Sequence, residues 1–289
     1  METIKKILEF LNFKCERPEV FGSFHLIGVA CVVVATVLLV WLLKNASGKS
    51  FRVLMLFIWL ILVLGELVRE GLTIYGTALV EMTDFTYQWY MFPYQLCSSP
   101  LYLLPLVVIL PDGRVRNAIM TFLGTFSLIG GLSVVIYPPE VLCGTTIINY
   151  QAFAHHGFQV FIGILCMVRL RERGLGFTRY LSSVAVFAVM TGIAMILNVV
   201  IHNHIVESGI DDMINLFYIS PYYNCAIPIL SDIQRIVPYP VFVGIYILGF
   251  SVAALLVFYI QKLIISLCTR NTPKKIRRRN AKIRDMAGL

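Results

Sequence analysis

Long apolar stretches separated by short polar connections make up most of this chain of 289 residues. Seven of these stretches reach the ~20 residues that an α-helix needs to cross the hydrocarbon of a bilayer. The pattern predicts an all-α fold, a polytopic membrane helix bundle with seven transmembrane helices, in one domain over residues 1–266. The predicted spans are Phe24–Lys44, Val53–Tyr75, Trp89–Leu110, Ala118–Tyr137, Asn149–Val168, Tyr180–His202 and Pro240–Ile265.

The two ends of the chain carry different signals. Apolar residues recur at helical spacing before the first span, which predicts a short interfacial helix at about residues 3–14. Residues 267–289 are rich in Lys and Arg, and we interpret them as a cytoplasmic tail that anchors the topology near anionic lipid, not as a nucleic-acid site. The apolar residues of the N-terminal helix are Ile4, Ile7, Leu8, Phe10 and Leu11.

Composition and charge fit a membrane protein and orient it. The chain is 58% hydrophobic and 14% charged, with a mean hydropathy of +0.80, whereas a soluble domain is roughly 25% charged. Eighteen Lys and Arg residues fall on one side of the predicted bundle and five on the other. The positive-inside rule therefore predicts that the C-terminus is cytoplasmic and the N-terminus outside or lumenal. The side with eighteen comprises the loops at 44–52, 111–117 and 169–179 and the tail from Lys262.

A thiol and an imidazole are predicted at the same depth. Cys97 lies eight residues into one span and His156 lies seven residues into another. At 1.5 Å of rise per residue, both would be roughly 10–12 Å below the same surface. A Cys needs a neighbouring base to act as a nucleophile, and His is the usual one. Cys97 and His156 are the candidate catalytic pair, with the adjacent His155 as the alternative base.

The backbone around Cys97 is predicted to be irregular. Pro93, Pro100 and Pro105 fall in the same span, and Pro100 lacks the N–H that would bond the Leu96 carbonyl. A helix that kinks or unwinds at membrane depth is tolerated only where protein or a cavity surrounds it. Polar side chains beside the thiol are candidates for stabilising an oxyanion. These candidates are Gln95, Ser98 and Ser99.

Other polar residues at membrane depth gather in the outer halves of the predicted spans. Polar and charged groups in that environment need partners, so we expect them to line or support one cavity. Arg69 lies three residues from Glu66, and we expect an ion pair between Arg69 and Glu66 or Glu70. No metal site is predicted, because adjacent histidines do not have the spacing of three or four that helical ligand pairs prefer. The predicted supporting residues are His25, Glu66, Arg69, Gln159 and Asn198.

Several of these stretches resemble the YwaF-like integral membrane family of bacteria and the transmembrane protein 164 family of acyltransferases. The resemblance implies a Cys and a His that pass an acyl chain between phospholipids without coenzyme A. It maps those roles onto Cys97 and His156, and less directly onto His155. Related membrane lipid hydrolases use Thr in place of Cys. The motifs are Val20–Leu26 with His25, Pro93–Cys97, His156-Gly157, and Asn215–Ile219 followed by Pro221 and Pro228.

The function predicted from residues and resemblance together is a lipid acyltransferase that forms a thioester on Cys97. Its substrates would be a phospholipid and a lysophospholipid, with no cofactor, in the outer or lumenal leaflet. One alternative is a membrane lipid hydrolase with the same pair of residues. The other is a small-solute transporter or receptor, in which the polar cluster of the outer half binds a ligand.

Overall fold

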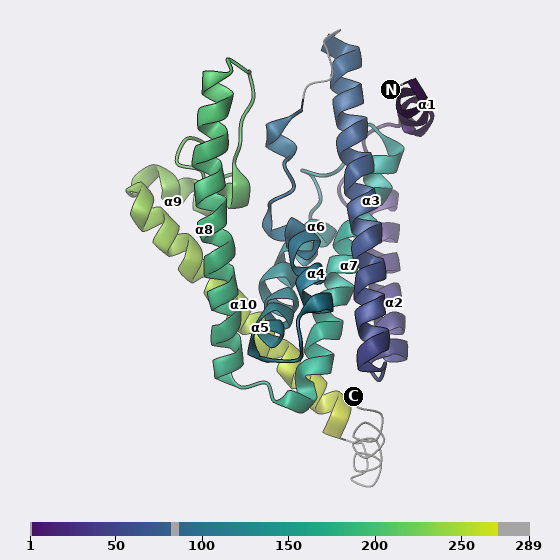
Figure 1. Ribbon diagram of the computed structural model, residues 1–289, viewed down its shortest axis with the longest axis vertical. Coiled ribbons are helices and arrows are strands. Elements are labelled where there is room, and N and C mark those ends of the chain that lie inside the picture. Colours follow the sequence, from purple (N-terminus) through teal and green to yellow (C-terminus); the bar gives the residue numbers. More distant parts are fainter. Residues whose placement is uncertain (1, 82–86, 271–289) are drawn as a thin grey trace.

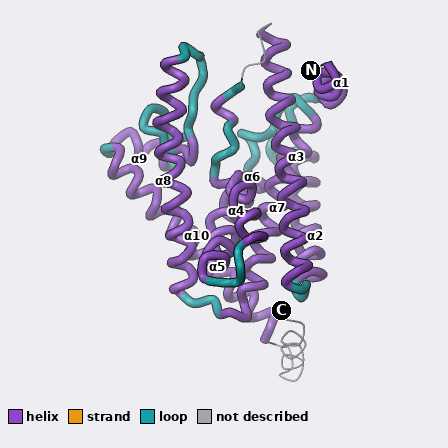
Figure 2. Tube along the Cα trace, in the orientation of Figure 1, coloured by secondary structure: helices purple, strands orange, loops and turns teal. Residues whose placement is uncertain are grey.

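The structure is a computed structural model that describes residues 2–81 and 87–270. Within these residues every regular element is a helix, and the helices form an elongated bundle (Figures 1 and 2). The predicted all-α bundle is confirmed, with six apolar helical segments long enough to cross a membrane. Those segments are α2 (Ser23–Leu43), α3 (Gly48–Glu81), α5 (Arg114–Phe122) continued by η3 (Leu123–Ser127) and α6 (Leu128–Ile136), α7 (Thr146–Leu170), α8 (Phe177–Glu207) and α10 (Tyr239–Arg270). Shorter elements are α1 (Glu2–Leu11), η4 (Arg171–Arg173), η5 (Leu216–Tyr218) and α9 (Leu230–Ile236), besides those around Cys97.

The bundle has a central pair of segments and an outer set of helices. In the most apolar part of α7 and of the α5–α6 segment 67% of the residues are buried, against 11% in α2 and 28% in α3 and α10. The outer helices therefore present apolar side chains such as Val37 and Leu256 outward. Such a surface is stable when lipid tails, which are as apolar as the core, cover it.

A single π-helical turn, η3, interrupts the predicted span Ala118–Tyr137. This turn packs closely on α7 through two glycines. A Cβ on Gly124 would lie 2.3 Å from Met167 Cγ, and one on Gly163 would lie 2.8 Å from the Leu123 carbonyl oxygen. Only glycine permits this approach of the two backbones.

The predicted third span is not one continuous helix. It comprises two 3₁₀ turns, η1 (Trp89–Met91) and η2 (Leu96–Ser98), followed by α4 (Ser99–Ile109). Pro100 lies in the first turn of α4, where its missing N–H has no helical partner to lose. The helix therefore begins beside Cys97, and at roughly 16 Å α4 covers only about half of the hydrocarbon thickness.

Side chains satisfy the carbonyls that the prolines leave without a partner. Pro105 cannot donate to the Leu101 carbonyl, and Trp59 Nε1 on α3 donates to that oxygen at 2.8 Å. Pro100 likewise cannot donate to the Leu96 carbonyl, which accepts from the Ser99 N–H and from Ser99 Oγ at 2.7 Å. Backbone polar groups in hydrocarbon must find partners within the protein, and here they do.

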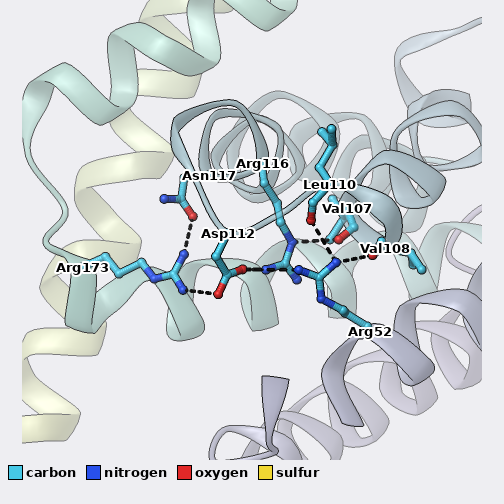
Figure 3. A network of polar contacts seen from close by, with 8 residues as sticks. All are labelled: Arg52, Val107, Val108, Leu110, Asp112, Arg116, Asn117 and Arg173. Atoms are coloured by element: carbon cyan, nitrogen blue, oxygen red, sulfur yellow. Dashed lines mark hydrogen bonds and ion pairs between the residues drawn. The ribbon is translucent and has the colours of Figure 1, made fainter. Parts of the chain in front are cut away.

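Arginines occupy the opposite, C-terminal end of α4 (Figure 3). Arg52 donates to the carbonyls of Val108 and, at 2.9 Å, Leu110. Arg116 Nε donates to the Val107 carbonyl at 2.7 Å. The last carbonyls of a helix carry the negative end of its dipole, so guanidinium groups stabilise this terminus.

The N-terminal helix is present as α1, beside α3 (Figure 1). Leu8 reaches Gly71 of α3, where a Cβ would lie 3.1 Å from the leucine methyl carbon. Its position on the membrane surface stays a prediction. Most of the predicted basic tail, from residue 271 to residue 289, lies outside the described residues.

We predict that Trp59→Phe lowers the free energy of unfolding by about 1–3 kcal/mol, because the Leu101 carbonyl loses its donor. The same change should cost less in a Pro105→Ala background, where a backbone N–H returns at position 105. Chemical unfolding of the four proteins in bicelles forms the double-mutant cycle. Trp41→Phe, at a lipid-facing tryptophan that is 63% exposed, is the control. An equal cost in both backgrounds would contradict the assigned contact.

Candidate functional site

The segment that carries Cys97 lies against α6 and α7. The Cys97 carbonyl accepts a hydrogen bond from His155 Nε2 at 3.2 Å. A Cβ on Gly130 of α6 would lie 3.2 Å from the Cys97 nitrogen, so the glycine permits this close approach. Cys97 itself is half-buried. The thiol is therefore held at the junction of three segments that are far apart in the sequence.

The hydrogen bond to Cys97 fixes the proton on His155. A carbonyl only accepts, so Nε2 is the protonated nitrogen and Nδ1 carries the lone pair. Nδ1 is buried and has no hydrogen-bond partner among the residues that the structure describes. Buried polar atoms are nearly always bonded, so this nitrogen is an exception within the bundle. Its lone pair is used by no described group.

An ion pair on α3 also contacts the segment that precedes Cys97. Arg69 Nε donates to Glu66 Oε1 at 3.1 Å, and Arg69 Nη2 donates to the same oxygen and, at 2.9 Å, to the Met91 carbonyl. The predicted pairing of Arg69 with Glu66 is thereby confirmed. Met91 lies in η1, so the ion pair is bonded to the segment that leads to Cys97. Side chains of α3 and α7 thus both hold the backbone of this segment.

His156 points in a different direction. Its Nδ1–H donates to Gln159 Oε1 at 3.4 Å, and its ring lines a small cavity with Val135 and Pro138. Neighbouring residues on a helix point about 100° apart, so one of two adjacent histidines faces the Cys97 segment and the other does not. The structure brings His155, and not His156, to that segment. The catalytic role of either ring stays a prediction.

Two of the predicted polar residues, Gln159 and Ser99, bond the backbone and not the Cys97 thiol. Gln159 Nε2 donates to the Ser127 carbonyl at 2.7 Å and to the Leu96 carbonyl at 3.4 Å. Ser99 Oγ, besides its bond to Leu96, lies 2.9 Å from Ser127 Oγ. These contacts join α7, the π-turn and the start of α4. Ser98 follows Cys97 directly in η2, and its side chain is buried.

Gln95 and Asn198 clamp the loop that contains η5. Gln95 Nε2 donates to the Asn215 carbonyl at 2.9 Å, and its Oε1 accepts from the Phe217 N–H at 2.7 Å. Asn198 Nδ2 donates to the Leu216 carbonyl at 3.0 Å, and its Oδ1 accepts from the N–H of the same residue at 2.8 Å. Both side chains therefore support a buried loop and do not face the thiol.

That loop contains a functional candidate that the sequence did not single out. Phe217 and Tyr218 both have φ of +56°, a left-handed conformation that costs bulky residues about 1–2 kcal/mol each. The clamps by Gln95 and Asn198 hold them there, and Gln95 lies two residues before Cys97 in the chain. Strained backbone of this kind clusters at functional sites. The only signal in the sequence is the motif at residues 215–219.

His25 joins the start of α2 to the end of α6. Its Nδ1 accepts from the Phe21 N–H at 2.8 Å, and its Nε2 donates to the Val135 carbonyl at 3.0 Å. Both ring nitrogens are occupied, and Val135 also lines the cavity beside His156. His25 therefore supports the His156 side of α7 and makes no hydrogen bond to the Cys97 segment.

These features define a multi-pass α-helical membrane protein with a half-buried cysteine, a buried histidine and a partly buried ion pair around a broken span. The chain matches the TMEM164 family over residues 20–262, and it belongs to that family. The match extends from the segment before α2 to near the end of α10 and includes every residue of the site. The chain matches no curated protein and no solved structure. Among the described residues no group of three or more His, Cys, Asp or Glu side chains could hold a metal ion.

We predict that Asn198→Leu, which keeps the side chain buried, lowers the free energy of unfolding by about 2–4 kcal/mol, because the Leu216 N–H and carbonyl both lose their partners. Hydrogen exchange of the loop at 215–218 should become faster, since the clamp opposes the strained backbone. Asn203→Leu on the exposed face of α8 is the matched control. Unchanged exchange in Asn198→Leu would show that the clamp does not hold the loop.

Proposed function

We propose that this chain is a phospholipid acyltransferase that moves a fatty acyl chain to a lysophospholipid through a thioester on Cys97, without coenzyme A. The observation that supports the proposal most is the hydrogen bond from His155 Nε2 to the Cys97 carbonyl at 3.2 Å, which leaves the buried Nδ1 without a partner among the described residues. The resemblance noted in the sequence implies the same chemistry. We assign the base to His155 in preference to His156, whose ring faces Gln159.

The first half-reaction would transfer the acyl group to the enzyme. His155 Nδ1 takes the proton of the Cys97 thiol, and Sγ attacks the carbonyl carbon of the phospholipid ester. The new C–S bond forms and the ester C–O bond breaks. The departing lysophospholipid oxygen takes the proton from the imidazolium, so His155 is again neutral.

The second half-reaction would run the same steps in reverse with a different acceptor. The hydroxyl of a lysophospholipid gives its proton to His155, and its oxygen attacks the thioester carbon. The C–S bond breaks, and the thiolate recovers its proton from the imidazolium. If water took the place of the lysophospholipid, the product would be a free fatty acid. Exclusion of water from the bundle therefore favours transfer over hydrolysis.

The remaining site residues would have supporting roles. The Glu66 carboxylate stabilises the imidazolium that forms when His155 takes a proton, as the acid of a catalytic triad does. Arg69 holds that carboxylate in place through its two donors. The hydroxyl of Ser98, which follows Cys97 in η2, and that of Tyr218 in the loop clamped by Gln95 and Asn198 are the candidate donors to a tetrahedral oxyanion. Positioning of the backbone falls to Gln95, Ser99, Gln159 and Asn198.

The site would work in the outer or lumenal leaflet. The basic connections lie at the other end of the bundle, which the positive-inside rule assigns to the cytoplasm. Tyr90 and Tyr222, each about half exposed, lie toward the same end as the site. Tyrosines of this kind suit the headgroup level, where an acyl ester would enter.

We predict an acyl adduct on Cys97. Purified protein incubated with phosphatidylcholine should gain the mass of one acyl chain, and neutral hydroxylamine should remove it because the bond is a thioester. Cys97→Ala should show no adduct, whereas Cys31→Ala, at an exposed cysteine on α2, should behave as the native protein. Acyl transfer by Cys97→Ala at the native rate would exclude the thiol as acyl carrier.

The two histidines should differ in their contribution to rate. His155→Ala should lower acyl transfer by about 10²–10⁴-fold, the usual contribution of a general base, and His156→Ala by at most about tenfold. Adding His155→Ala to Cys97→Ala should cost little more, because residues that act as a unit are non-additive. His204→Ala, at an exposed histidine of α8, is the control. A larger loss in His156→Ala would move the base to His156, and native rates in both would remove histidine from the mechanism.

A further inference from the structure

Two cysteines lie close together where the segment after α1 meets the connection between α6 and α7. A short antiparallel bridge joins the two segments, between Lys14 and Thr145. The Cys15 N–H donates to the Gly144 carbonyl at 3.1 Å. Cys15 therefore lies opposite Gly144, whose neighbour in the chain is Cys143.

The two backbones are close enough for a disulfide. Paired strands lie about 4.8 Å apart and each residue advances about 3.4 Å, so the Cα atoms of Cys15 and Cys143 are roughly 6 Å apart. Disulfides join Cα atoms separated by about 4.4–6.8 Å. Cys15 Sγ lies 4.0 Å from the Cys143 carbonyl oxygen, and Cys143 Sγ lies 3.8 Å from the Thr145 carbonyl oxygen. Thiols are weak donors, so these contacts do little to oppose rotation of the two sulfurs toward each other.

The side chain of Asn149, near the start of α7, contacts both cysteines. Its Oδ1 accepts from the Cys143 N–H at 2.8 Å, and its Nδ2 donates to the Cys143 carbonyl at 2.8 Å. The same Nδ2 lies 3.5 Å from Cys15 Sγ. Asn149 is 1% exposed, so this amide is fixed by its surroundings. The two cysteines are therefore held beside each other by the backbone bridge and by one buried side chain.

The compartment favours oxidation of this pair. The connection at residues 138–148 contains no Lys or Arg, and the positive-inside rule assigns its end of the bundle to the outside or the lumen. Disulfides form and persist in such compartments. Cys15 is exposed and Cys143 is half-buried, so a soluble oxidant can reach the pair. Cys225, in the connection at 203–239, is by contrast 3% exposed.

We propose that Cys15 and Cys143 form a disulfide that ties the N-terminal segment to the start of α7. The oxidant is a disulfide compound of that compartment, such as oxidised glutathione. The Cys15 thiolate attacks one oxidant sulfur, which forms a mixed disulfide and releases one oxidant thiol. Cys143 Sγ then attacks the Cys15 sulfur and releases the second oxidant thiol. The two protons and two electrons that the protein thiols lose are carried away by the two released thiols.

The bond anchors α1 on the bundle. Cys15 follows the end of α1 by four residues, and Leu8 of α1 reaches Gly71 of α3 (Figure 1). The two cysteines are 128 positions apart in the chain. A cross-link over so long a loop removes much conformational freedom from the unfolded chain, so the oxidised protein is the more stable form.

The direct test is peptide mass spectrometry of the full chain from cell membranes. Free thiols are blocked with N-ethylmaleimide during denaturation, and the protein is then digested without reduction. We expect a pair of peptides that joins Cys15 to Cys143 and separates after reduction. Maleimide on both cysteines, or a bond from either one to Cys225, would overturn the proposal.

Thermal unfolding in nanodiscs, with and without dithiothreitol, measures the effect of the bond. Dithiothreitol should lower the unfolding temperature of the native protein by about 5–10 °C. Cys15→Ser and Cys143→Ser should each unfold near the lower temperature and show no response to dithiothreitol. Cys268→Ser, which removes an exposed thiol near the other end of the chain, should respond as the native protein does. A native-sized response in Cys15→Ser would assign the effect to another bond and contradict the proposal.

Discussion

The requirement that every backbone polar group find a partner inside the bilayer governs this structure. The segment before α4 is not α-helical, and α4 itself contains Pro105, so several of their carbonyls bond side chains from other helices. Arg69 bonds the Met91 carbonyl, His155 bonds the Cys97 carbonyl, and Trp59 bonds the Leu101 carbonyl. The first role of these polar residues at membrane depth is therefore to bond the backbone of the interrupted third span. The arrangement of polar side chains around the Cys97 segment results from the same contacts.

Much of the architecture can be read from the sequence because membrane helices have a strong composition signal. Six predicted spans correspond to long helices, and the i,i+3 spacing of Glu66 and Arg69 correctly predicted their ion pair. The prolines correctly indicated unwinding beside Cys97. Hydropathy could not show which of His155 and His156 faces that segment, because α7 is buried over most of its circumference and has no polar face that fixes its rotation.

The clamped loop shows the other limit of sequence reasoning. Left-handed backbone is usually signalled by Gly or Asn, yet Phe217 and Tyr218 adopt it without such a residue. Two amides that are distant in the sequence, Gln95 and Asn198, impose it. Such a conformation is a tertiary effect, and no local pattern records it. Gln95 is less suitable as the oxyanion donor that the sequence suggested, because its side-chain nitrogen and oxygen both bond this loop.

The π-turn at η3 has a consequence for how the sequence of this region can vary. A π-turn is equivalent to one extra residue inserted in an α-helix, and each residue turns a helix by about 100°. The two halves of the span are therefore set at different rotational phases. Gly130, beyond the turn, meets Cys97, whereas Gly124, within it, meets α7. Loss of one residue here would rotate Gly130 away from the cysteine, so the spacing between these glycines should tolerate substitutions far better than insertions or deletions.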